Sequence, residues 1–190
     1  MKSATSLVAT LLLFLAAGIA PAQTTEEHIN LDTPTGRIAG TLQLPAALEG
    51  KPRVALIIAG SGPTDRDGNN PLIPGRNDSL RMLAVALAEE GIATLRYDKR
   101  GVAASLAAGP TESELRFENY VEDAATWIAR LKADPRFASV AVIGHSEGSL
   151  IGMLAAQQGG AAAFVSIAGI ETKVRPPSCG SNWPASCRPN

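Results

Sequence analysis

The sequence predicts an α/β fold in which helices cover both faces of a mostly parallel sheet. Short apolar runs alternate with amphipathic segments of helical spacing, and two of the apolar runs end in glycine-containing loops. Strands that alternate with helices along a chain are typical of parallel sheets with right-handed crossovers. Catalytic groups in such sheets gather at the carboxyl ends of the strands, so the two loops are predicted to form the functional site.

Five segments are predicted as strands. Residues 37–44 alternate polar and apolar side chains, a pattern typical of a half-exposed antiparallel edge strand. Residues 54–59 and 140–143 are continuous apolar runs, which indicate strands buried on both faces. Residues 92–97 and 163–168 complete the set.

Three helices are predicted between these strands. Apolar residues over 80–87 repeat at helical spacing, and either Asp78 or Ser79 can cap the start of this helix. A second apolar stripe at helical spacing covers residues 121–131, and residues 149–158 form the third helix.

The composition fits one soluble domain and excludes several classes of protein. The 190 residues are 45% hydrophobic and 18% charged, and with 4% aromatic residues the core must consist of Ala, Leu, Val and Ile. The net charge of −1, without a basic block, argues against a nucleic-acid-binding surface. Two cysteines and two histidines are too few for a zinc site, so no metal is expected.

The first 22 residues are predicted to be a secretory signal peptide. Lys2 gives a positive start, residues 7–17 are apolar apart from Thr10, and Ala20-Pro21-Ala22 places small residues where a signal peptidase reads. This apolar run is too short to span a bilayer of about 30 Å, so no stable membrane anchor is expected. Cleavage after Ala22 would release the protein to the periplasm or beyond.

The segment Gly144-His145-Ser146-Glu147-Gly148 fits the pattern G-x-S-x-G and lies between a predicted buried strand and a predicted helix. A nucleophile on such a sharp turn has a strained backbone, and only small neighbours avoid a clash. The helix that follows directs free N–H groups toward the site. Ser146 is therefore the candidate nucleophile. The Glu147 side chain is expected to be structural, and His145 is expected to point away from the working side of Ser146.

The polar loop after Gly60 is predicted to contribute to an oxyanion hole. Acyl transfer needs two N–H donors aimed at the carbonyl oxygen, and the backbones of Ser61 and Glu147 can supply them. A plain Gly-Pro turn is the alternative interpretation of the loop.

The same loop contains a partial calcium-binding pattern. Asp65, Asp67 and Asn69 copy the first three ligands of a calcium loop, but Asn70 stands where a glycine is needed and Arg76 where a glutamate is required. A calcium site is therefore not expected.

Three segments of the chain carry a family resemblance. They are Gly60-Ser61-Gly62-Pro63-Thr64-Asp65-Arg66-Asp67-Gly68-Asn69, Leu95-Arg96-Tyr97-Asp98-Lys99-Arg100-Gly101, and Gly144-His145-Ser146-Glu147-Gly148-Ser149. Together they resemble the α/β-hydrolase superfamily, in particular the secreted bacterial esterases of the EstD-like group, which are close to serine aminopeptidase-type hydrolases. The resemblance implies Ser146 as nucleophile, Ser61 and Glu147 as oxyanion donors, and hydrolysis of small carboxylic esters without a cofactor.

The triad of this family runs Ser, then Asp or Glu, then His in chain order. After Ser146 the sequence contains no histidine and no aspartate, and its acids there are Glu147 and Glu171. Neither His28 nor His145 occupies the family position of the base. We expect the strands that carry the acid and the base to follow residue 168, and we expect the printed chain to be inactive or weakly active.

Two alternatives share these motifs. An aminopeptidase or thioesterase of the same fold would use the same turn, and a non-catalytic binding module would keep it only as scaffold. The expected ligand of the esterase is a small-molecule ester, and no nucleic-acid partner is expected.

Hydrophobic periodicity stops at Lys173, and the segment that follows is rich in proline. One interpretation is a tail in which Cys179 and Cys187 form a disulfide. The other is a reading-frame error, because back-translation with GC-rich codons and a two-base shift gives an amphipathic helix. We therefore divide the chain into a signal peptide (1–22), a partial α/β-hydrolase domain (23–170) and an irregular or frameshifted tail (171–190).

The N-terminus of the exported protein tests the signal-peptide prediction. If cleavage follows Ala22, N-terminal sequencing of periplasmic or secreted protein begins at Gln23. An intact Met1 on exported protein contradicts the prediction.

Overall fold

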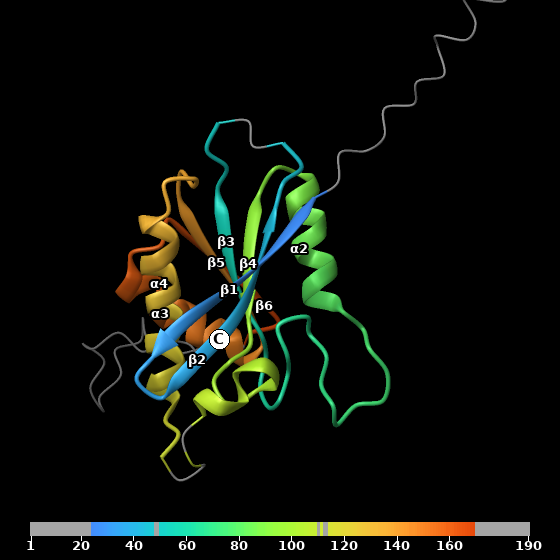
Figure 1. Ribbon diagram of the computed structural model, residues 1–190, viewed down its shortest axis with the longest axis vertical. Coiled ribbons are helices and arrows are strands. Elements are labelled where there is room, and N and C mark those ends of the chain that lie inside the picture. The colour runs from blue at the N-terminus through green and yellow to red at the C-terminus, as the bar shows by residue number, and fades with distance from the viewer. Residues whose placement is uncertain (1–23, 48–49, 110, 112–113, 170–190) are drawn as a thin grey trace, which may run out of the picture.

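Within the described residues, the five predicted strands and one further, mostly polar strand form a six-stranded sheet with helices on both faces (Figure 1). The computed structural model describes residues 24–47, 50–109, 111 and 114–169, so the expected signal peptide and tail lie outside the described residues. The strands lie in the spatial order β1-β2-β4-β3-β5-β6. Their bounds are β1 (Thr25–Thr33), β2 (Gly36–Leu44), β3 (Val54–Ile58), β4 (Ala93–Tyr97), β5 (Val140–His145) and β6 (Ala163–Ile167).

Four of these strands form the parallel part of the sheet, which confirms the predicted fold class. β3 pairs in parallel with β4 and with β5, and β6 pairs in parallel with β5. All residues of β3 and β4 are buried, as expected for strands that are covered on both faces. The carboxyl ends of β3, β4 and β5 consequently lie at one edge of the sheet, where ligand sites form in such folds.

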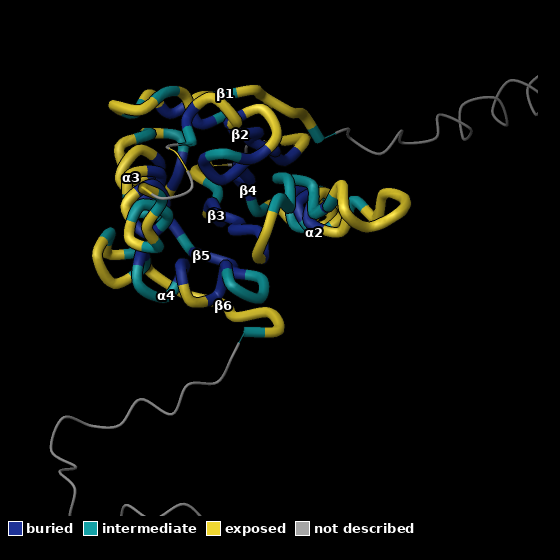
Figure 2. The backbone as a smooth tube through the Cα atoms, turned by 90° about the horizontal axis from the view of Figure 1, so that it is seen from below, coloured by how far each residue is buried: buried dark blue, intermediate teal, exposed yellow. Residues whose placement is uncertain are grey.

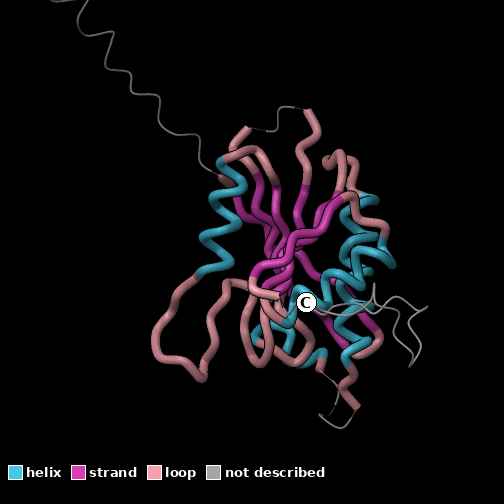
Figure 3. The backbone as a smooth tube through the Cα atoms, turned by 180° about the vertical axis from the view of Figure 1, so that it is seen from behind, coloured by secondary structure: helices cyan, strands magenta, loops and turns pink. Residues whose placement is uncertain are grey.

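An antiparallel hairpin of β1 and β2 forms one side of the sheet, at the top of Figure 2, and helices flank the strands on the left and right in Figure 3. The prediction of an edge strand over 37–44 is wrong in this respect, because β2 lies between β1 and β4 and most of it is buried. β1 is the edge strand. Its side chains are mostly polar and only Leu31 is buried, so its apolar signal is too weak to predict a strand.

Within the described residues, three α-helices and one 3-10 helix surround the sheet. Helix α2 lies on one face, whereas α3 and α4 lie on the other (Figure 2). The larger core lies under α3 and α4 and includes Trp127, which is fully buried, and a smaller core lies under α2. The bounds are α2 (Ser79–Glu89), η2 (Ala103–Ala108), α3 (Phe117–Ala133) and α4 (Glu147–Gly159).

None of the helices in the described part has the length and apolar character that a membrane crossing requires.

The start of α2 differs from the predicted cap. Asp78 occupies the N-cap position with φ 45°, but its side chain makes no capping hydrogen bond. Its carboxylate instead accepts hydrogen bonds from Asn69 Nδ2 at 2.7 Å and Arg76 Nη2 at 2.9 Å, which together hold the pKa of Asp78 below its usual value. Asp78 thus stabilises the loop that precedes α2.

β6 lies at the edge of the sheet opposite β1, and its apolar side chains are exposed. The exposed fractions of Phe164, Val165 and Ile167 are 36%, 48% and 37%. Within the described residues, β6 pairs only with β5. An exposed apolar edge of this kind is a surface on which a further strand can pair.

Candidate active site

The connection between β5 and α4 is a sharp turn at Ser146. Because β5 ends at His145 and α4 begins at Glu147, Ser146 alone makes the turn. Its backbone has φ 54° and ψ −119°, in a region that non-glycine residues rarely occupy. The Ser146 N–H donates to the Ile167 carbonyl at 2.8 Å, so the end of β6 helps to hold the turn.

Two glycines permit this turn because the backbone segments around it touch. A Cβ on Gly144 would overlap the carbonyl of Gly148. A Cβ on Gly148 would overlap the Ile58 carbonyl oxygen and lie 2.6 Å from the Ala59 carbonyl oxygen. The first turn of α4 therefore packs directly on the end of β3, and the G-x-S-x-G pattern follows from this contact.

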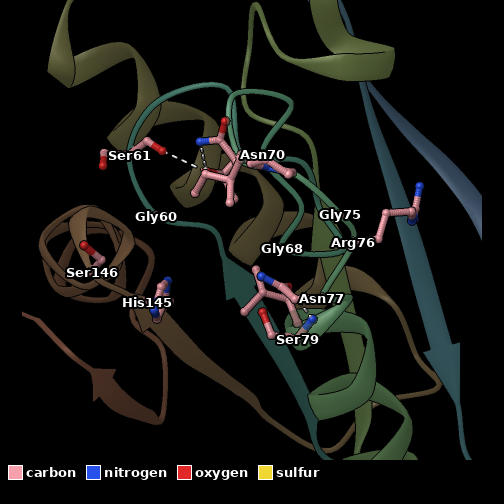
Figure 4. Close-up of a pocket in the computed structure, with 14 residues that line it drawn as sticks. Gly60, Ser61, Gly68, Asn70, Gly75, Arg76, Asn77, Ser79, His145 and Ser146 are labelled. Atoms are coloured by element: carbon pink, nitrogen blue, oxygen red, sulfur yellow. Dashed lines mark hydrogen bonds between the residues drawn. The ribbon is translucent and has the colours of Figure 1, made fainter.

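The loop after β3 lies against the same turn. A Cβ on Gly60 would lie 3.2 Å from His145 Nδ1 and 3.4 Å from Ser146 Cβ, so the two loops meet at Gly60 (Figure 4). The backbone N–H groups of Ser61 and Glu147 have no hydrogen-bond acceptor among the described residues. Both groups are therefore available to a ligand oxygen.

A cavity of about 580 Å³ opens beside Ser146. Ser61, Asn70 and His145 contribute to its lining (Figure 4). Arg76 is the only Lys, Arg, Asp or Glu among the described residues that line the cavity. The hydrogen bond from the Arg76 guanidinium to Asp78 raises the pKa of Arg76, so Arg76 stays a cation.

A family model described as serine aminopeptidase, S33, matches residues 73–179, which is more than half of the chain. The chain belongs to this family. The predicted resemblance to α/β hydrolases is thereby confirmed, while the assignment to the EstD-like group stays a prediction. No curated protein matches the chain.

Solved structures of α/β hydrolases share the fold of this S33-family chain. Dienelactone hydrolase from Anabaena variabilis is 22% identical with a TM-score of 0.59, over 77% of this chain and 64% of that one. GrgF from Penicillium sp. sh18 is 22% identical with a TM-score of 0.57, over 76% and 46%. Brefeldin A esterase, a bacterial homologue of human hormone sensitive lipase, is 20% identical with a TM-score of 0.52, over 70% and 35%. The chain thus spans about one third to two thirds of the length of these proteins.

In this S33-family chain, ion pairs to β4 and the residues that follow it hold the loop after β3. Arg66 donates to Asp98 through its backbone N–H at 2.8 Å and its Nη2 at 2.7 Å, and Arg96 Nε donates to Asp67 at 2.8 Å. The Asp65 carboxylate accepts the N–H groups of the residues two and four positions further on. The partial calcium pattern is therefore a network of turns, and the described residues contain no group of three His, Cys, Asp or Glu that could hold a metal.

The Glu147 side chain is ion-paired with Lys99, a residue that the sequence analysis does not single out. Lys99 Nζ donates to Glu147 Oε2 at 2.8 Å and to the Gly60 carbonyl at 2.6 Å. The only signal for this contact in the sequence is that all three residues lie in the segments that carry the family resemblance.

The two histidines of this S33-family chain line different cavities. His145 is half-buried and lines the cavity beside Ser146. The prediction that His145 points away from the working side of Ser146 is therefore wrong. His28 lies on β1 with its Nδ1 3.4 Å from Thr41 Oγ1, and it lines a separate cavity of about 430 Å³. Among the described residues, no side chain forms a hydrogen bond with Ser146 Oγ.

The contact between α4 and β3 predicts the effect of enlarging Gly148. Gly148→Ala should lower the free energy of unfolding by about 1–3 kcal/mol, because the new methyl group overlaps fixed backbone carbonyls. Urea denaturation followed by circular dichroism measures the change.

Gly91→Asn is the matched control for this variant. Gly91 has φ 78° and open space around its Cβ position, so asparagine there should change the free energy of unfolding by less than about 1 kcal/mol. An equal loss of stability in both variants contradicts the steric account of the turn.

Proposed function

We propose that this chain is the nucleophile-bearing part of a serine hydrolase that acts on carboxylic esters. The observation that carries the proposal is the position of Ser146 on a strained turn beside a cavity, close to the backbone N–H groups of Ser61 and Glu147, which have no acceptor among the described residues. This arrangement suits acyl transfer, in which a serine attacks a carbonyl while N–H donors stabilise the negative oxygen.

The proposed reaction has two steps. Ser146 Oγ bonds to the ester carbonyl carbon and gives its proton to a general base, and the C–O bond to the alcohol then breaks as the alcohol takes up that proton. Water next attacks the acyl-enzyme in the same way, which releases the carboxylic acid and restores the serine. In both steps the backbone N–H groups of Ser61 and Glu147 would bind the oxyanion.

The general base is proposed to come from sequence beyond β6. His28 lines a cavity that Ser146 does not line, and His145 makes no hydrogen bond to Ser146 in the described part of the chain. The chain also spans only 64% or less of the three solved hydrolases described above. A base and an acid supplied by further strands would complete the triad, as the sequence analysis expects.

The charge of the cavity favours an ester over an N-terminal peptide as substrate. An aminopeptidase must bind the α-ammonium group of its substrate, for which a carboxylate is the natural partner. The described lining of the cavity beside Ser146 contains no carboxylate, and its one cation, Arg76, is already paired with Asp78 at 2.9 Å. A neutral acyl group is therefore more compatible with this cavity than an aminoacyl group.

Hydrolysis assays with two substrates test the proposal. A longer chain that carries the shifted frame from the tail (171–190) onward should hydrolyse p-nitrophenyl butyrate and should not release p-nitroaniline from alanine p-nitroanilide. The printed chain should hydrolyse the ester about 10⁴- to 10⁶-fold more slowly, because its triad is incomplete. Ser146→Ala should abolish the activity, while Ser139→Ala, at the opposite end of β5, should retain it.

Two results would contradict this proposal. Preferential hydrolysis of the anilide would assign an aminopeptidase instead. Turnover of the ester by the printed chain at ordinary enzyme rates, lost in Ser146→Ala, would show that the base lies within the described residues. His145 would then be the first candidate, since it lines the same cavity as Ser146.

A further inference from the structure

Lys99 is a buried cation at the carboxyl end of β4. Its exposed fraction is 2%, although lysine is rarely buried without a partner. Its Nζ donates to the Gly60 carbonyl at 2.6 Å and to Glu147 Oε2 at 2.8 Å, and it lies 5.2 Å from the centre of the Tyr120 ring. One ammonium group thus joins the loop after β3 to the first residue of α4.

The Gly60 carbonyl and the Ser61 N–H belong to the same peptide group. Because that group is planar and trans, its C=O and N–H point in opposite directions. The hydrogen bond from Lys99 to the carbonyl therefore fixes the direction in which the Ser61 N–H points. It also polarises the peptide, which makes the N–H a stronger donor.

The second contact of Lys99 acts on the other free N–H group. Glu147 is the first residue of α4, and its backbone N–H is the donor next to Ser146. Its carboxylate is held by Lys99, so the ion pair restrains the residue that presents this N–H. The same pairing neutralises a negative charge that would otherwise lie close to a developing oxyanion.

We propose that Lys99 is a positioning residue that sets the geometry of the oxyanion hole through the Gly60–Ser61 peptide and Glu147. This inference rests on the proposed function of Ser146, Ser61 and Glu147. A purely structural role is the alternative, because a buried ion pair can hold a fold together without any part in catalysis.

A nearby ion pair separates the two roles. Arg100 and Asp123 form a buried pair that joins the segment after β4 to α3, and Arg100 also donates to Thr35. Among the described residues, Arg100 makes its hydrogen bonds and its ion pair with Asp123 and Thr35 and none with Gly60 or Glu147. Arg100→Met therefore removes a buried cation next to Lys99 in sequence but changes no contact of the Gly60–Ser61 peptide or of Glu147.

Binding of phenylboronic acid to the full 190-residue chain tests the proposal without a general base. Ser146 Oγ would bond to boron and release its proton to the buffer. The boron would become tetrahedral and negatively charged, with one oxygen in the oxyanion hole. ¹¹B NMR detects the tetrahedral adduct, and titration gives its Kd. Ser146→Ala shows how much of the binding depends on the serine.

Lys99→Met should raise the Kd of this adduct by about 10- to 100-fold. This increase is no larger than the effect expected from removing an N–H group that contacts the oxyanion directly. Glu147→Gln, which keeps the shape of the side chain, should raise this Kd by a smaller factor. It tests the same ion pair if Lys99→Met does not fold. Arg100→Met should leave the Kd within about 3-fold of the parent chain, although its melting temperature falls. In a chain with ester activity, Lys99→Met should lower kcat with little change in KM.

The outcomes are distinct. A serine adduct that forms with unchanged affinity in folded Lys99→Met overturns the positioning role and leaves the proposed function standing. Equal weakening in Lys99→Met and Arg100→Met assigns Lys99 a structural role only. Absence of any Ser146-dependent adduct, both in the parent chain and in a longer chain that carries the proposed base, overturns both this inference and the proposed function.

Discussion

The contact between the first turn of α4 and the end of β3 determines the geometry around Ser146. Gly148 lies so close to the carbonyls of Ile58 and Ala59 that no side chain fits between them. The chain must therefore reverse direction within a single residue, and Ser146 adopts a positive φ as a result. The strain at Ser146 follows from this backbone contact. The Glu147 N–H has no acceptor among the described residues because Glu147 is the first residue of α4.

A second constraint comes from three consecutive residues after β4. Asp98 binds Arg66 in the loop after β3, Lys99 binds Gly60 and Glu147, and Arg100 binds Asp123 on α3. All three side chains are largely buried, so each needs its partner to offset the loss of hydration. The segment after β4 thus fixes the loops that border the cavity, although neither of these loops follows it directly in the chain.

The sequence predicts the parts of this site that depend on local patterns. The apolar runs predict β3 and β5, and the G-x-S-x-G pattern predicts the turn at Ser146, because both arise from steric rules that act over a few residues. The sequence does not predict β1, because its mostly polar side chains resemble those of a loop. It also does not predict the Lys99–Glu147 pair, because the two residues are 48 positions apart. Contacts of that separation depend on the order of strands in the sheet, which short-range patterns do not encode.

Covalent labelling with a fluorophosphonate tests the central claim that Ser146 is the nucleophile, and the test uses a verified longer chain that carries the base and the acid proposed to follow β6. The serine oxygen bonds to phosphorus and fluoride leaves, so each labelled site carries one adduct that peptide mass spectrometry can locate. The account predicts one adduct on the peptide that contains Ser146, and none after heat denaturation or in Ser146→Ala. Labelling spread over several serines, or no labelling of that longer chain, would contradict it and favour a non-catalytic scaffold.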